Sequence, residues 1–213
     1  SKGKDTPTGH HEIVGYINPI GWYTFPKVVP VFPEKEMDML IQEAKLTGFL
    51  GNKHASGEDI IKEYGEAHLD SGHPIVYTSA DSVVQIAAHE QGFGLNNLYK
   101  TCKIASDVFN IIGVQRIIAR PFLGGNKEDF FRTKNRKDFI LPPPIQTLCD
   151  KVIKSGKKCF GIGKIADIFG HRGISKSISG MSDDKLFDEM LNVIEKANTG
   201  DLIFANFVEF DTL

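Results

Sequence analysis

The part of the chain beyond three consecutive prolines, at 142–144, alternates helical and strand patterns, and this alternation constrains the fold most strongly. Apolar residues recur at helical spacing over 145–153 and 186–194, and a short apolar run stands between them at 159–163. Residues 202–208 are almost continuously apolar, as expected for a strand covered on both faces of a parallel sheet. The alternation is typical of a layered α/β fold. We therefore predict helices packed on a mainly parallel sheet.

Before the prolines the patterns are less regular. We predict strands over 28–32, 74–78 and 116–119, and a loop at 51–57. We also predict four helices: a short one within 1–25, one that follows Pro33 and ends at Gly48, one that includes Ile60 and Ile61, and one over 95–112 that ends at Gly113. The chain has 213 residues, which is enough for one large domain or two small ones. The three prolines are the clearest interruption, and we place a domain boundary there.

Composition and charge exclude several classes of protein. The formal net charge of −2 gives no general reason to expect binding to nucleic acid or to a membrane surface. There is no apolar run of about eighteen residues, as an ordinary membrane-spanning helix would need. The three cysteines show no C-x-x-C spacing, which favours free thiols in a reducing compartment. The polar N-terminus lacks the apolar segment of a signal peptide. We expect a cytoplasmic protein.

Polar residues that could carry chemistry follow several of the predicted strands. They are Ser79, Asp81, Arg120, Lys164 and Asp211. Ligands of open α/β sheets collect beyond the carboxyl ends of the strands. Carboxylates suit divalent cations, whereas Arg and Lys suit phosphate.

A basic segment adds two more candidates, Arg132 and Arg136. The guanidinium fork can hold two phosphate oxygens, so these residues and Arg120 together would make a strong phosphate site. The alternative is that Arg132 and Arg136 are solvated charges or members of surface ion pairs.

A turn rich in glycine and threonine at 3–10, G-K-D-T-P-T-G-H, precedes an apolar pair. A hydroxyl at such a turn, with a helix behind it, lies where backbone N–H groups and the helix dipole favour an anion, so a phosphorylated Thr6 fits there. The alternative is that Thr6 or Thr8 caps a helix. Two other patterns are set aside, because 161–164 lacks the spacing of a nucleotide phosphate loop and the adjacent His10 and His11 make a poor chelating pair.

The segment at 3–13, G-K-D-T-P-T-G-H-H-E-I, resembles the G-K-D-T-x-T-G-H-W-E-I segment of bacterial-type phosphopentomutases. The resemblance continues, in the order of the family, through G-N-K-H-A-S-G at 51–57, Y-T-S-A-D-S-V-V-Q-I-A-A-H-E at 77–90, A-R-P-F at 119–122, R-T-K-N-R at 132–136, G-I-G-K-I-A-D-I-F at 161–169 and V-E-F-D at 208–211. These blocks span essentially the whole chain.

The resemblance implies a member of the alkaline phosphatase superfamily that interconverts ribose 1-phosphate and ribose 5-phosphate, and their deoxyribose forms, through a phosphothreonine and a bisphosphate intermediate. It implies a metal-bearing α/β core with an inserted smaller α/β cap. We expect a partial alkaline-phosphatase-like core at 1–25 and 142–213, and the cap at 26–141.

The resemblance also implies roles for single residues. Thr6 would be the phosphothreonine, and Asp211 one ligand of two manganese ions. Ser79 and Asp81 would contact the ribose. The distal phosphate would be held by Arg120, Arg132, Arg136 and Lys164. The expected partner is a pentose phosphate.

The chain departs from the family pattern in several places. His11 replaces a tryptophan, and His54 replaces a usual proline. The family's remaining metal ligands, an upstream Asp-Ser motif and later histidines, are not in this sequence. We therefore expect an internal fragment that does not turn over substrate by itself. The alternatives are another phosphomutase or phosphatase of the superfamily, which the Ser79-Ala80-Asp81 run disfavours, and a non-catalytic module that binds sugar phosphates.

Overall fold

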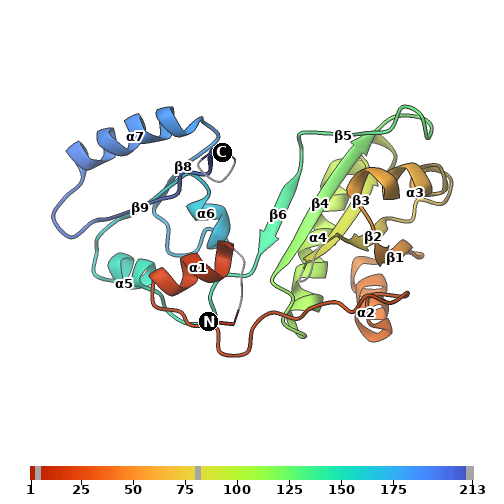
Figure 1. The fold of residues 1–213 in the computed structure, drawn as a ribbon, viewed down its shortest axis with the longest axis horizontal. Helices are drawn as coiled ribbons and strands as arrows, with labels where there is room; N and C mark the ends of the chain where they lie inside the picture. The colour runs from red at the N-terminus through yellow and green to blue at the C-terminus, as the bar shows by residue number, and fades with distance from the viewer. Residues whose placement is uncertain (3–5, 80–82, 210–213) are drawn as a thin grey trace. The chain divides into compact units, whose positions relative to one another are not determined.

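The computed structural model describes residues 1–2, 6–79 and 83–209, and the chain forms two compact units. Unit 1 combines Ser1–Gly21 with Ile140–Leu213, and unit 2 is Trp22–Phe139 (Figure 1). Unit 2 is therefore inserted in the chain of unit 1. The units divide at 21/22 and 139/140, whereas the sequence analysis places the domain boundaries at 25/26 and 141/142.

Unit 1 is built on a small parallel sheet. Its elements are α1 (Thr6–Ile13), α5 (Leu148–Lys154), β7 (Cys159–Ile162), α6 (Ile165–Ile168), β8 (Lys176–Ile178), α7 (Asp183–Lys196) and β9 (Leu202–Ala205). The strand order is β8-β7-β9, with both pairs parallel. Cys149, Cys159, Ile165 and Phe169 are buried together where α5 and α6 pack on β7. This unit has the layered α/β arrangement predicted from the helix–strand alternation.

Helix α5 shows how the sequence specifies these elements locally. The Thr147 side chain accepts a hydrogen bond from the Asp150 N–H, while the Asp150 carboxylate accepts one from the Thr147 N–H. This capping box satisfies two backbone donors at the start of the helix.

The prediction that 202–208 forms a strand covered on both faces is wrong for the residues that the structure describes. The strand β9 is shorter, Leu202–Ala205, and all four of its residues are partly exposed. The reason is its place in the sheet, since β9 pairs with β7 alone and forms an edge.

Unit 2 is built on a six-stranded mixed sheet. Its elements are α2 (Glu34–Ala44), β1 (Leu50–His54), α3 (Gly57–Ser71), β2 (Ile75–Thr78), β3 (Val83–His89), the π-helix η1 (Glu90–Gly94), α4 (Leu95–Asn110), β4 (Arg116–Leu123), β5 (Phe131–Arg132) and β6 (Lys137–Ile140). The order is β1-β2-β3-β4-β5, and β6 also pairs with β4. The β1–β2 and β3–β4 pairs are parallel, and the β2–β3 and β4–β5 pairs are antiparallel.

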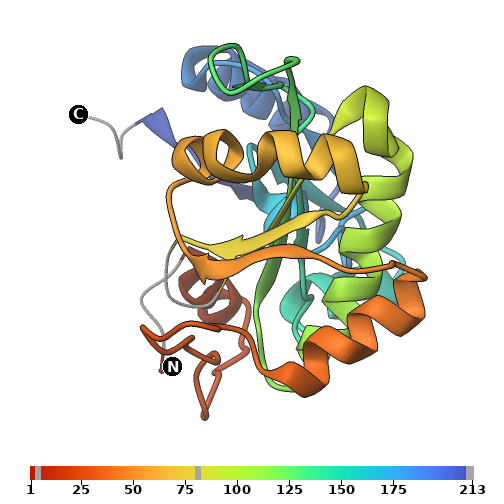
Figure 2. The same ribbon diagram turned by 90° about the vertical axis from the view of Figure 1, so that its right-hand side faces the viewer.

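Alternate residues of the central strands face opposite sides of this sheet. On β3, Val84 and Ile86 lie in one buried cluster with residues of α2 and α4. Ala87 lies in another cluster on the opposite face, against α3, and Tyr77 of β2 belongs to the same cluster. The helices can be followed around the sheet in Figure 2. Gln85, between Val84 and Ile86, therefore shares the α3 face with Tyr77.

Two predictions in unit 2 are wrong. Residues 28–32 form no strand, because Pro30 has no N–H and the Asn52 side chain instead accepts hydrogen bonds from the Val31 and Phe32 N–H groups, at 2.9 and 2.7 Å. The predicted loop at 51–57 overlaps β1, which begins at Leu50. Gly51 and Asn52 adopt positive φ angles of 89° and 60° and produce a shift in register within an otherwise parallel pairing with β2.

The predicted helix ends are also displaced. The helix α2 ends at Ala44, with Lys45 in the left-handed conformation, and Gly48 lies beyond it. In the described ranges, no helix is long and apolar enough to span a lipid bilayer.

Candidate functional site

A pocket of about 350 Å³ opens beside strand β4 in unit 2. It is lined by Arg120, Pro121, Arg132, Thr133, Lys134 and Arg136. Four of these six residues are cationic. Guanidinium and ammonium groups that converge on one pocket favour a phosphate-bearing ligand.

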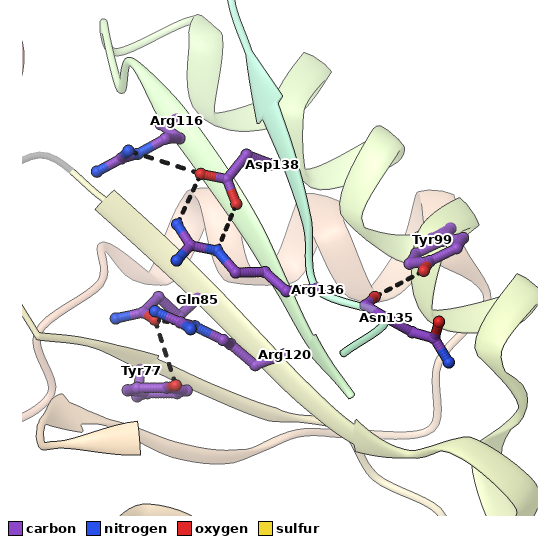
Figure 3. A network of polar contacts seen from close by, with 8 residues as sticks. All are labelled: Tyr77, Gln85, Tyr99, Arg116, Arg120, Asn135, Arg136 and Asp138. Atoms are coloured by element: carbon purple, nitrogen blue, oxygen red, sulfur yellow. Dashed lines mark hydrogen bonds and ion pairs between the residues drawn. The ribbon is translucent and has the colours of Figure 1, made fainter. Parts of the chain in front are cut away.

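Arg120 is half-buried and is anchored by a neutral amide. Its Nε donates a hydrogen bond to Gln85 Oε1 at 2.8 Å, and Tyr77 Oη donates to the same oxygen at 3.3 Å (Figure 3). Gln85 Nε2 donates to Ser79 Oγ. Burial, and the nearby charge of Arg136, lower the pKa of Arg120. The network joins Ser79, at the end of β2, to the pocket.

Arg120 also corrects a detail of the sequence analysis, which places it just after a strand at 116–119. The strand β4 continues to Leu123, so Arg120 lies inside it. The reason is the long parallel pairing with β3, in which Ala87 stands beside Arg120 and Ala88 beside Pro121.

Arg136 is held by a carboxylate. Its Nε donates to Asp138 Oδ1 at 2.7 Å and its Nη2 donates to Asp138 Oδ2 at 2.8 Å, and Arg116 Nη1 lies 3.6 Å from Oδ2 (Figure 3). The hydrogen bond to Asp138 raises the pKa of Arg136. A bidentate pair of this kind fixes the plane of the guanidinium as well as its position.

Arg132 extends to the first turn of α3. Its Nη2 donates to Glu58 Oε1 at 2.8 Å. Gly57 lies between this arginine and Tyr77, and a Cβ at that position would stand 2.9 Å from Tyr77 Oη and 3.4 Å from Arg132 Nη1. The absence of a side chain at Gly57 therefore lets α3 begin against the polar cluster.

The segment that carries Lys134 is tied to η1 and α4. Thr133 Oγ1 donates a hydrogen bond to Glu90 Oε1, and Asn135 Nδ2 donates to the same oxygen at 3.0 Å. Tyr99 Oη donates to the Asn135 carbonyl at 2.6 Å (Figure 3). These contacts fix the backbone on both sides of Lys134.

In unit 1, Thr6 is the first residue of α1 and is exposed. One turn later, His10 Nδ1 lies 2.8 Å from the Thr6 carbonyl oxygen, and His10 Nε2 lies 3.2 Å from Asn206 Nδ2, just beyond β9. His11 contacts a different group, the Ile168 carbonyl, at 3.2 Å. The two histidines therefore point to different partners.

Lys164 is exposed just after β7. The preceding Gly163 has a φ of +77°, and a Cβ there would stand 2.1 Å from the Asn206 carbonyl oxygen. The Asn206 N–H donates to the Ile162 carbonyl at 3.1 Å. Asn206 thus connects the end of β7 with His10, so α1 and the Gly163–Lys164 turn both contact the carboxyl end of β9.

The residues singled out from the sequence fall into three groups. Ser79, Arg120, Arg132 and Arg136 lie in one polar cluster of unit 2. Thr6 and Lys164 belong to unit 1. Asp81 and Asp211 lie outside the described residues.

Sequence patterns do not point to Gln85, Asp138 or Glu58, which hold the three arginines. Gln85 does carry a detectable signal, since it is a polar residue inside the apolar run of 83–88. The carboxylates of Asp138 and Glu58 carry no such signal. In the sequence they look like any other acidic surface residue, and only their contact with an arginine distinguishes them.

The predicted metal ligand, Asp211, lies outside the described residues. Within the described ranges, no three His, Cys, Asp or Glu side chains gather closely enough to hold an ion. The donors of the described residues therefore do not by themselves make a site for two manganese ions.

Comparisons with curated proteins give relatives along the whole chain. Proteins named Phosphopentomutase from Chelativorans sp. (strain BNC1) and Chromohalobacter salexigens are each 49% identical to it over 213 residues. One from Shewanella loihica is 46% identical over 212 residues. The chain spans about half the length of these relatives, 51–52% of each. No protein-family model matches the chain.

Proposed function

We propose that this chain is part of a phosphopentomutase, an enzyme that interconverts ribose 1-phosphate and ribose 5-phosphate, and their deoxyribose forms. The similarity to proteins of that name over the whole chain supports the assignment. In this proposal the segment 26–141 is the cap, and 1–25 and 142–213 belong to an alkaline-phosphatase-like core. The mixed α/β structure of both units is consistent with it.

The observation that carries the proposal is the cationic pocket of unit 2. Four cationic side chains line it, and Arg120 is linked through Gln85 to the Ser79 hydroxyl. A sugar phosphate presents both kinds of partner, since its phosphate accepts hydrogen bonds from guanidinium groups and its hydroxyls can bond to Ser79. We propose that this cluster binds the pentose phosphate, with Asp81 as a further contact to the ribose. For Lys164, which belongs to unit 1, a contact to the phosphate is proposed from the resemblance alone.

In the same proposal Thr6 carries the phosphoryl group. The phosphoryl group would pass from Thr6 Oγ to the free hydroxyl of the sugar phosphate and give a bisphosphate, and the other phosphate would then return to Thr6. Exposure of Thr6 at the first turn of α1 supports this role, because backbone N–H groups there favour a phosphate. The resemblance to phosphopentomutases also implies manganese ions, and Asp211 would be one of their ligands.

Isothermal titration calorimetry with ribose 5-phosphate tests the binding site. We expect the protein to bind ribose 5-phosphate, and Arg120→Ala and Lys164→Ala each to weaken binding by roughly tenfold to a hundredfold, the range for a lost hydrogen bond to a charged group. Lys62→Ala, an exposed lysine of α3 outside the pocket, serves as a control and should bind normally.

Turnover of ribose 5-phosphate with manganese tests the activity itself. The intact enzyme should convert ribose 5-phosphate to ribose 1-phosphate, and Thr6→Val should abolish this conversion while ribose 5-phosphate still binds. Binding without turnover in the intact enzyme would instead favour the non-catalytic module. Failure to bind any pentose phosphate would refute the assignment of the pocket.

A further inference from the structure

Gln85 is a deeply buried polar residue of the cluster around the pocket. Its side chain is 2% exposed and extends from the middle of the sheet, on strand β3. The amide has one oxygen with two lone pairs and one nitrogen with two hydrogens. The oxygen accepts from both Arg120 and Tyr77, and the nitrogen donates to Ser79. A buried amide without such bonds would destabilise the fold, so these contacts fix its orientation.

The three partners come from different parts of the sheet. Tyr77 stands directly opposite Gln85 across the antiparallel β2–β3 pair. Arg120 comes from β4, on the other side of β3, and Ser79 follows β2. Gln85 therefore holds Ser79, which follows one strand, and Arg120, which lies inside another, in a common geometry. Figure 3 shows Gln85 beside Arg120 and Tyr77.

Gln85 differs from the other anchors of the pocket in its charge. Arg132 pairs with the carboxylate of Glu58, and Arg136 pairs with that of Asp138. Within the described ranges, the only hydrogen-bond partner of the Arg120 guanidinium is the neutral Gln85 amide. The amide accepts a hydrogen bond from Nε, and Arg120 also lines the pocket. A neutral anchor orients a guanidinium without offsetting its positive charge.

We propose that Gln85 is a positioning residue, which holds Ser79 and Arg120 in place for a phosphorylated pentose and adds no negative charge of its own beside Arg120. This inference rests on the proposed function. Gln85 itself would not touch the reacting atoms.

Two substitutions of similar size separate the orienting contribution from the charge. Gln85→Met keeps the length of the side chain and removes the hydrogen bonds, so Arg120 and Ser79 lose their common anchor. Gln85→Glu keeps an acceptor for Arg120, removes the donor to Ser79 and places a carboxylate against the guanidinium. Both variants should bind ribose 5-phosphate roughly tenfold to a hundredfold more weakly than the unmodified protein.

The matched control is Ile86→Val, at the neighbouring position of the same strand. Ile86 is fully buried in the cluster on the opposite face, with α2 and α4. Removal of one methylene group lowers stability, as such core changes do, without touching the polar network. This variant should melt at a lower temperature and bind ribose 5-phosphate normally.

Calorimetry with ribose 5-phosphate, and KM and kcat measured separately on the intact enzyme, give the readouts. We expect a raised KM and a nearly unchanged kcat in both Gln85 variants, because the lost contacts act on binding of the substrate. If Gln85→Glu binds as tightly as the unmodified protein, the charge argument is overturned. If both variants bind normally, or if Ile86→Val weakens binding as much as they do, Gln85 has only a structural role.

These outcomes are distinct from a failure of the proposed function. Gln85-dependent binding of ribose 5-phosphate in a protein without turnover would contradict the mutase assignment and support the inference. Normal turnover with no change of KM in either Gln85 variant would overturn the inference and leave the mutase assignment standing.

Discussion

The close approach of Gly163 to β9 makes a sharp prediction about the variant Gly163→Ala. Gly163 has a φ of +77°, a conformation that alanine adopts only with strain, and the new Cβ would stand 2.1 Å from the Asn206 carbonyl oxygen. Hydrogen bonds restrain both sides of this contact. The Gly163 N–H donates to the Ile178 carbonyl at 2.8 Å, and the Asn206 N–H donates to the Ile162 carbonyl at 3.1 Å. The ends of β7 and β9 must therefore separate to admit the methyl group.

The expected loss of stability has two contributions. The left-handed conformation costs about 1 kcal/mol for alanine relative to glycine. Forcing apart well-packed groups typically costs about 1–3 kcal/mol. We expect Gly163→Ala to lower the free energy of unfolding of unit 1 by about 2–4 kcal/mol, the sum of these ranges.

Gly156→Ala isolates the first contribution. Gly156 has the same φ, +77°, and a Cβ there would meet nothing within 4 Å. It should cost only about 1 kcal/mol. Denaturant unfolding gives the global values, and hydrogen exchange of the β7 and β9 amides locates the effect in this sheet. Equal losses in the two variants would show that the contact with Asn206 does not constrain the turn, and would refute the reasoning.

Two further predictions concern unit 2. His68 accepts a hydrogen bond from the His89 N–H at its Nε2, at 2.9 Å, and burial lowers its pKa from the ordinary value of 6.5. The unfolded chain therefore binds a proton below about pH 6.5 that the folded chain does not, so stability should fall as pH falls below that value, and His68→Gln should reduce this slope in thermal unfolding measured from pH 7 to 5. Gly57→Ala would place a Cβ 2.9 Å from Tyr77 Oη and should raise the KM for ribose 5-phosphate by roughly tenfold or more, because small displacements at a binding site are costly. Gly125→Ala, where the nearest atom would lie 3.9 Å away, should leave KM unchanged, and an equal rise in both variants would contradict the explanation.

Local patterns predict the elements of this fold best where one face is clearly apolar. The helix over 95–112 and the strand at 74–78 are confirmed as α4 (Leu95–Asn110) and β2 (Ile75–Thr78). Patterns fail where a partner far along the chain decides the structure. The strand β1 contains Gly51 and Asn52, which are turn-formers, and only its pairing with β2 makes it a strand.

The candidate site shows the same limit. The sequence indicates each arginine as a separate cation, because an arginine can be recognised from its own neighbours in the sequence, without its partner in space. It does not reveal their anchors, since Gln85 and Arg120 are 35 residues apart and Glu58 and Arg132 are 74 apart. The antiparallel β2–β3 pair and the parallel β3–β4 pair bring Tyr77, Gln85 and Arg120 together, and no local spacing in the sequence encodes either pairing.

The insertion of unit 2 within unit 1 has a consequence for how the two units unfold. Unit 1 is closed by contacts between distant segments, such as the bond from the Leu148 N–H to the Val14 carbonyl. While unit 2 is folded, the chain between these segments is a rigid body with fixed ends. If unit 2 melts, the same stretch becomes a flexible loop of more than a hundred residues, whose closure costs about 4 kcal/mol in chain entropy. Stability is thus transmitted from unit 2 to unit 1 through the connectivity of the chain.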